Sequence, residues 1–321
     1  MATSYPVSRR LFAMAAKVEA TYGTDSVPTF ATNAVRLMDR PTITHTFLAE
    51  NLREAWFTGG LGQLAAVSPS GQAMEIDFSV PMHGTGVAYA STAPPNIDPF
   101  LRAAGFAVAY TTGSVAYDVT DQPTTGLSVY TRMDGKEYHA VGCIVTDWTI
   151  SASAGEYPTF SGKLRGIAGS TAVAEVDIGS ITLPSTVPPL FKGATCVISS
   201  YTPVIRSFEL SGGLTFATRG DGNASLGHAG FRITRRQPEF RPVIEMADIT
   251  DFNPEADWFA ATIRQLDFNL SNATHNQFAI QAVDMRVIGY SDSDEDGLSL
   301  VEPVYQINTP AAGNELEIKF L

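Results

Sequence analysis

The dominant feature of the sequence is an alternation of apolar and polar residues with a period of two. In residues 74–82 every second side chain is apolar. The same alternation recurs in four further segments, carried by Ile144, Trp148 and Ile150, by Phe208, Leu210, Leu214 and Phe216, by Leu266, Phe268 and Leu270, and by Leu316, Ile318 and Phe320. This period predicts strands with one face on a core and the other in water. We therefore expect a mainly β protein.

The segment 278–288 departs from this alternation, because its phase flips between Ala282 and Val283. One extra residue in a strand produces such a flip, so we expect a β-bulge there.

The sequence also predicts two short helices. In the first, Asp98 is placed to cap, Pro99 occupies the first helical position, and Gly105 follows the last turn. In the second, Asn253 is placed to cap a helix that starts at Pro254 and runs through 255–263. Each helix follows one strand and precedes several more.

The spacing of these helices suggests an internal repeat. Pro99 and Pro254 lie 155 residues apart, and Gly155 and Gly313 lie 158 residues apart. A proline-rich segment, 169–203, separates the two sets and suits a linker or crossover. A chance match of spacings is the alternative.

The repeat predicts two tandem β-sandwich or barrel domains, each with a short flanking α-helix. We expect an N-terminal domain over 1–190 and a C-terminal domain over 191–321.

Composition argues against several classes of function. The 321 residues carry a net charge of −12, so the surface should repel nucleic acid unless its few basic residues gather in one place. The two cysteines, Cys143 and Cys196, stand in apolar surroundings and are expected to be buried free thiols. The sequence holds no apolar run of about 20 residues, so we expect no membrane partner.

Motifs for catalysis or metal binding are weak. The five histidines are too widely spaced for HExxH-like metal sites, and we expect no catalytic residue and no cofactor. Residues Asp292 to Gly297 resemble the start of a calcium loop, but Pro303 stands where that loop needs a bidentate Glu. An acidic hairpin turn is the favoured interpretation of Asp292–Asp296, and weak divalent binding is the alternative.

The N-terminal segment carries a family resemblance. Residues 11–29, with Lys17-Val-Glu19-Ala-Thr21-Tyr22-Gly23-Thr24-Asp25, and the continuation Asn33-Ala34-Val35 resemble the opening of tail tube proteins from phages with long, non-contractile tails. Weaker similarities follow at Pro99–Phe106, Asp134–Gly142, Ala154–Pro158, Asp294–Gly297 and Gly313–Leu316.

This resemblance implies a structural virion protein and no enzyme. Family members pair their sheets around a ring, and the rings stack into a tube through which duplex DNA passes without sequence-specific binding. Implied partners are further copies of the chain, the tape measure protein, and the tail terminator and tip proteins. The implied location is the virion tail, after assembly in the host cytoplasm. Rivals are a minor tail or baseplate ring protein and, less favoured, a carbohydrate-binding β-sandwich module.

The length of the chain bears on the ring. Single-domain relatives form hexamers, and this chain is about twice as large, so three copies would give a trimeric ring with pseudo-sixfold symmetry. A hexamer with the second domain outside is the alternative.

Two sets of residues are candidates for these roles. The polar phase of the clearest strands predicts a lumen-facing set, Glu75, Asp77, Asp147, Glu209, Asp267 and Glu317, although Lys163 and Arg165 interrupt it and a merely soluble face is the alternative. The long span 42–64 predicts a ring-stacking set, Arg53, Trp56 and Phe57, for which an intrachain core position is the alternative. Its counterpart in the second half would be 219–228.

Overall fold

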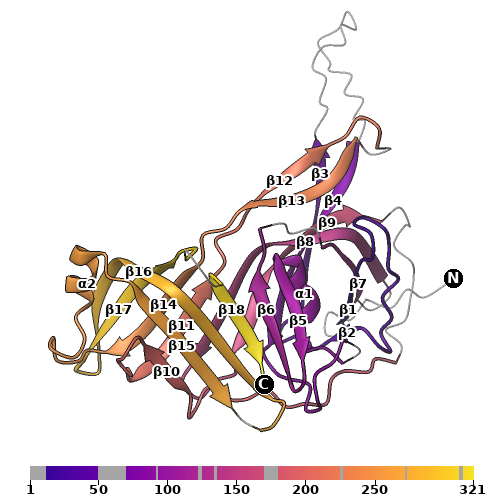
Figure 1. Ribbon diagram of the computed structural model, residues 1–321. Coiled ribbons are helices and arrows are strands. Elements are labelled where there is room, and N and C mark those ends of the chain that lie inside the picture. The colour runs from indigo at the N-terminus through magenta and orange to yellow at the C-terminus, as the bar shows by residue number, and fades with distance from the viewer. Residues whose placement is uncertain are drawn as a thin grey trace, which may run out of the picture.

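The computed structural model describes residues 12–49, 70–91, 93–121, 125–133, 136–169, 180–224, 227–271, 273–310 and 314–321. Strands dominate these residues, and one antiparallel sheet contains most of them (Figure 1). The prediction of a mainly β fold is therefore confirmed. Within the described residues the sheet does not close into a barrel.

Eight strands form a continuous layer that we call the long layer. Its strands, in spatial order, are β3 (Thr42–Ala49), β4 (Ser70–Pro81), β9 (Thr159–Ala168), β8 (Lys136–Ser153), β11 (Ile205–Ser211), β14 (Glu239–Glu245), β17 (Leu298–Ile307) and β16 (Gln277–Glu295). Both halves of the chain contribute to it, because β8 of the first half pairs with β11 of the second.

The remaining strands of the large sheet extend from the N-terminal parts of β8 and β16. On β8 they are β7 (Leu127–Met133), β1 (Phe12–Val18) and β2 (Ala34–Val35); on β16 they are β15 (Arg264–Ser271) with β10 (Thr195–Ile198), and β18 (Leu316–Phe320) with β6 (Ser114–Val119) and β5 (Phe106–Thr111). We call these strands the second layer. Two further strands, β12 (Thr215–Gly220) and β13 (His228–Arg235), form a separate hairpin.

The core lies between the two layers. Phe208 of β11 and Phe268 of β15 are both buried, and their ring centroids are 4.8 Å apart. Because side chains alternate along a strand, the neighbours of Phe208 in sequence point out of one face of the molecule. The neighbours of Phe268 point out of the opposite face. The fold is thus a sandwich in which each layer has one outward face.

The second helix confirms its predicted cap. In α2 (Pro254–Ala260) Oδ1 of Asn253 accepts a hydrogen bond from the N–H of Ala256 at 2.9 Å. The helix ends at Ala260, three residues earlier than the sequence pattern suggested, because Ala261 adopts a left-handed conformation (φ +49°).

The first helix corrects its prediction. In α1 (Asp98–Ala103) the N-cap residue is Ile97, and Asp98 is the first helical residue and caps nothing with its side chain. Its carboxylate is buried and accepts hydrogen bonds from the hydroxyls of Tyr117 (2.8 Å) and Tyr110 (3.2 Å). Tertiary partners from β5 and β6 therefore hold the side chain away from the helix N–H groups.

The two halves of the chain show the same order of strand pairing. The first half pairs in the order β1-β7-β8-β9-β4-β3, and the second in the order β10-β15-β16-β17-β14-β11. The β5–β6 hairpin and β18 have no counterpart in this scheme. In this scheme β9 of the first half is equivalent to β17 of the second half. The spacing of Gly155 and Gly313 had instead suggested that β9 is equivalent to β18.

The correspondence extends to single residues of the long hairpins. The β7–β8 register shifts between Ala140 and Cys143, and the β15–β16 register shifts between Ala282 and Met285, the position at which the sequence predicted a bulge. A second shift occurs between Val145 and Asp147 in β8 and between Val287 and Gly289 in β16. All four pairs are offset by the same 142 residues, so β8 and β16 follow one pattern of bulges.

Candidate assembly surfaces

Four of the six predicted lumen residues share one surface. Glu75, Asp77, Asp147 and Glu209 all lie on strands of the long layer, in the phase opposite to the buried residues. Asp77 and Asp147 are both in register with Lys163 of β9.

The basic residues that interrupted the sequence pattern are partners of these acids. Nη1 of Arg165 lies 2.8 Å from Oε1 of Glu75, and Glu209 is in register with Arg241. The outward face of the long layer is therefore a mixed surface in which cross-strand pairs offset part of the acidic charge.

The other two predicted lumen residues lie on the opposite surface. Asp267 is on β15 beside the buried Phe268, and Glu317 is on β18; both are in register with Gln281 of β16. Because the two layers face each other across the core, this surface points away from the one that carries Glu209. The six predicted residues therefore divide between two surfaces, four on one and two on the other.

Sequence reasoning missed Glu239 among the acids of the long layer. Glu239 of β14 corresponds to Glu75 of β4 in the repeat, because Glu239 directly precedes Phe240, which pairs with Tyr305 of β17, and Glu75 directly precedes Ile76, which pairs with the equivalent Leu164 of β9. Its carboxylate Oε2 lies 2.6 Å from Nη2 of Arg241, much as Glu75 lies next to Arg165. The alternation in 239–245 could have revealed it, since Glu239 and Arg241 occupy the polar phase.

The predicted stacking residues Arg53, Trp56 and Phe57 lie outside the described residues. The flanking strands β3 and β4 project from the body next to the β12–β13 hairpin (Figure 1). The described residues of the predicted counterpart, 219–224 and 227–228, lie where β12 ends and β13 begins.

The β12–β13 hairpin is fastened to the first half by Tyr22. The hydroxyl of Tyr22 donates to the carbonyl of Gly142 (2.9 Å) and accepts from the N–H of Phe231 (2.8 Å). The Phe231 ring packs with Ala73 and Ile144 of the long layer. The guanidinium of Arg165 lies 5.3 Å from that ring, a cation–π distance.

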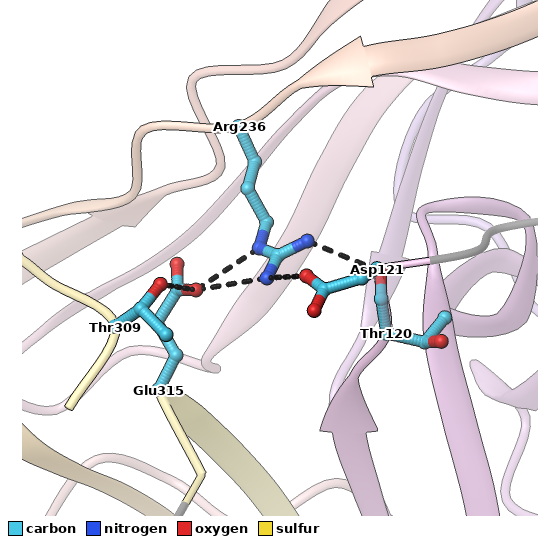
Figure 2. Close-up of polar contacts among 5 residues, drawn as sticks. All are labelled: Thr120, Asp121, Arg236, Thr309 and Glu315. Atoms are coloured by element: carbon cyan, nitrogen blue, oxygen red, sulfur yellow. Dashed lines mark hydrogen bonds and ion pairs between the residues drawn. The ribbon is translucent and has the colours of Figure 1, made fainter. Parts of the chain in front are cut away.

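A second polar cluster joins the halves near β18. Figure 2 shows Arg236, from the segment between β13 and β14, between Glu315 on one side and Thr120 and Asp121 on the other. Nη2 of Arg236 lies 3.0 Å from Oε2 of Glu315 and 2.8 Å from Oδ1 of Asp121. Burial alone would lower the pKa of Arg236, but the hydrogen bonds to these two carboxylates raise it.

One cavity of about 460 Å³ opens between the N-terminal segment, the loop after β4 and the crossover at 183–186. His83 is the titratable side chain among its lining residues. Burial lowers the pKa of His83, and its Nδ1 lies 2.7 Å from the carbonyl oxygen of Gly84. The cavity brings no pair of acid and base groups together.

The acidic turn forms as the sequence predicted. Asp296 and Gly297 have positive φ angles of 53° and 84° and connect Glu295 to Leu298 in a two-residue hairpin. Within the described part of the chain, no group of three or more His, Cys, Asp or Glu side chains is placed to hold a metal ion. Cys143 and Cys196 are buried free thiols, as predicted, and burial raises the pKa of Cys196 to about 12.

Comparison with known proteins gives the chain its family. Among the described residues, no helix is long and apolar enough to span a membrane. A comparison with curated proteins finds no match. The family model of the phage tail tube protein matches residues 12–313, nearly the whole chain. The chain therefore belongs to the phage tail tube protein family, whose members have a structural role in the virion tail.

Proposed function

We propose that three copies of this chain close into a ring and that such rings stack into the tail tube through which genomic DNA passes. The observation that carries the proposal is the long layer, at whose two ends β3 and the C-terminal part of β16 (residues 286–295) each have one edge without a strand partner among the described residues. Unpaired edges favour pairing with another chain, and a closed ring removes them.

The corresponding pairing orders support a tandem arrangement. We propose two tube-like domains, 1–190 and 191–321, related by internal duplication. Each would supply four strands to the long layer: β3, β4, β9 and β8 from the first, and β11, β14, β17 and β16 from the second. Three copies would then present six similar units, which is the basis of the pseudo-sixfold symmetry.

The size of such a ring is suitable for DNA. Three long layers would contribute twenty-four strands. With a strand spacing of about 4.8 Å and a tilt of about 35–45°, the backbone barrel would be roughly 45–50 Å across. Side chains extending about 5 Å inward would leave a bore wide enough for a duplex.

We propose that the outward face of the long layer lines this bore. Glu75, Asp77, Asp147 and Glu209 would then face the DNA, while Asp267 and Glu317 would lie on the outside. Acidic groups in the wall repel phosphates, and Lys163 and Arg165 moderate that repulsion. An electron microscopy map of the tube that placed Asp147 and Glu209 on its outer surface would reject this assignment.

The stacking role of Arg53, Trp56 and Phe57 also stays a proposal. They lie in sequence between β3 and β4, which project in the same direction as β12 and β13. We expect Trp56→Ala to leave rings intact and to reduce their stacking into tubes. Unfolding of the monomer would instead support a core position.

The remaining partners follow from the tube: tape measure protein in the lumen before DNA enters, and terminator and tip proteins at its ends. The site of action would be the virion tail, after assembly in the host cytoplasm. A minor tail or baseplate ring protein is the second candidate, because its fold and edges would be the same.

Negative-stain electron microscopy of the purified chain tests the proposal. Long hollow filaments with three copies per ring are expected. Isolated rings would favour the minor tail or baseplate role, a ring of six copies would support the hexamer, and monomers at all concentrations would reject self-assembly.

A further inference from the structure

The structure contains one contact between its two halves that can serve as a template. Thr149–Ser153 of β8 pair with Ser207–Ser211 of β11, and we call this pairing the internal seam. The N–H of Ala154 donates to the carbonyl of Arg206 (2.8 Å), and the N–H of Gly212 donates to the carbonyl of Trp148 (3.0 Å). The alternation of an antiparallel ladder then directs the backbone groups of Phe208 and Leu210 at β8.

The correspondence between the two halves of the chain identifies the equivalents of the two seam edges, those of β8 and β11, at the two ends of the long layer. Adding the 142-residue offset to the β8 side of the seam gives Ser291–Glu295 of β16, which pair with β17 on one edge only. All five of these residues are exposed.

The β11 side of the seam corresponds to residues 40–44, in and just before β3. Leu210 of β11 pairs with Phe240 of β14, which pairs with Tyr305 of β17. In the same way Ile43 of β3 pairs with Ile76 of β4, which pairs with Leu164 of β9. Because Tyr305 and Leu164 occupy equivalent positions of the repeat, Ile43 is equivalent to Leu210. Within the described residues β3 pairs only with β4, so its other edge is open.

We infer that residues 40–44 of one copy pair in antiparallel fashion with Ser291–Glu295 of the next copy, in the register of the internal seam. This inference rests on the proposed ring and names the contact that closes it. Thr42 would face Ser293, as Glu209 faces Ser151, and Thr44 would face Ser291, as Ser211 faces Thr149.

The chemistry of the two edges fits this register. Arg40 would stand opposite Glu295, where the internal seam has two serines, so opposite charges meet, and the Glu295 carboxylate also pairs with Arg206 of its own copy at 2.6 Å. Pro41 has no N–H and can contribute only its carbonyl, so this seam has one hydrogen bond fewer than the internal one. Asp292 and Asp294 replace the buried Ile150 and Ala152. The seam between copies is therefore more polar and more readily reversed than the seam within a copy.

An exposed apolar patch accompanies the open edge of β16. The patch consists of Trp258, Phe259, Ile263 and Ile288, whose exposed fractions are 46%, 75%, 52% and 45%. Ile288 lies on β16 itself, and α2 packs against that strand (Figure 1). Exposed aromatic residues beside an unpaired edge are what a contact with a second copy would cover.

Disulfide trapping tests the register. In the double variant Thr42→Cys/Ser293→Cys the two thiols of neighbouring copies would face each other at a non-hydrogen-bonded pair, where the backbones are close enough for a disulfide. After oxidation of assembled protein, a non-reducing gel should show covalent dimers and a terminal band of three copies. The native thiols should not interfere, because Cys143 and Cys196 are both buried.

Two matched variants serve as controls. Ser151→Cys/Glu209→Cys occupies the same row of the internal seam and should close within one copy, leaving a monomer band. Thr44→Cys/Glu295→Cys places the thiols about 13 Å apart in the inferred register and should give about tenfold less cross-linking than Thr42→Cys/Ser293→Cys.

The outcomes separate the seam from the proposed function. Rings that form while Thr42→Cys/Ser293→Cys cross-links no better than the mismatched pair would overturn the seam and leave the ring standing. A terminal band of six copies would support the seam and overturn the ring of three. Wild-type protein that forms no ring would overturn both.

Discussion

Arg236 and Glu315 form an ion pair within the second half of the chain, with Nε at 3.1 Å and Nη2 at 3.0 Å from the same carboxylate oxygen. The exposed fractions of the two side chains are only 22% and 6%. Removing one member of a buried pair leaves the other uncompensated. We expect Arg236→Met to lower the free energy of unfolding by about 3 kcal/mol, as measured by urea denaturation.

Arg241 supplies the matched control for that experiment. It pairs with Glu239 at 2.6 Å, but the exposed fraction of its side chain is 52%. Arg241→Met should cost at most about 1 kcal/mol. Equal losses in the two variants would show that Arg236 contributes no more than a surface pair does.

Gly212 allows β11 to approach Trp148 at the internal seam. A Cβ at this position would lie 2.2 Å from the indole Nε1 of Trp148, a buried ring. We expect Gly212→Ala to destabilise the monomer by about 1–3 kcal/mol, since the ring or the strand must shift. Gly220→Ala, where nothing lies within 4 Å, should change stability by no more than about 0.5 kcal/mol. Thermal unfolding of the two variants side by side is the measurement.

Asp98 should make stability depend on pH. Burial raises the pKa of its carboxyl above the ordinary 3.8, although hydrogen bonds from Tyr117 and Tyr110 oppose the rise. A carboxyl with a raised pKa in the folded state contributes stability at low pH, and the contribution is lost as the pH rises from 3.8 through the folded-state pKa. Asp98→Asn keeps an oxygen acceptor and should gain stability relative to the wild type between pH 4 and pH 7.

Asp248 should give the opposite trend. Hydrogen bonds from the backbone and side chain of Thr250 lower the pKa of this exposed carboxyl. Its contribution is present above the ordinary pKa and is lost as the pH falls, so Asp248→Asn should lose stability relative to the wild type as the pH rises. Stability curves that changed with pH in the same direction for the two variants would contradict one of the two assignments.

Trp258 and Phe259 should act in assembly and not in folding. Both are exposed in the single chain. We expect Trp258→Ser/Phe259→Ser to leave the melting temperature of the monomer unchanged and to raise the critical concentration for tube formation about tenfold, since an aromatic anchor in an interface contributes at least about 1.4 kcal/mol. Val187→Ser, at another exposed apolar residue, should leave assembly unaffected.

Local chemistry accounts for the features that the sequence predicted correctly. The strands, the cap at Asn253, the bulge between Ala282 and Met285 and the turn at Asp296 each depend on residues that are neighbours along the chain. Alternation also predicted which side chains of each strand point away from the core, and Asp147 and Glu209 are examples.

Tertiary structure decided what alternation cannot encode. A period of two distinguishes the two faces of one strand but does not say to which layer the strand belongs, so Glu209 and Asp267 looked equivalent in sequence and lie on opposite surfaces. Asp98 looked like a helix cap in the sequence, but its carboxylate accepts hydrogen bonds from Tyr110 of β5 and Tyr117 of β6. The pairing of β8 with β11 likewise joins segments far apart in the chain. The sequence by itself thus determined the strands and their faces, and only the packing of distant segments decided which edges meet and which stay open.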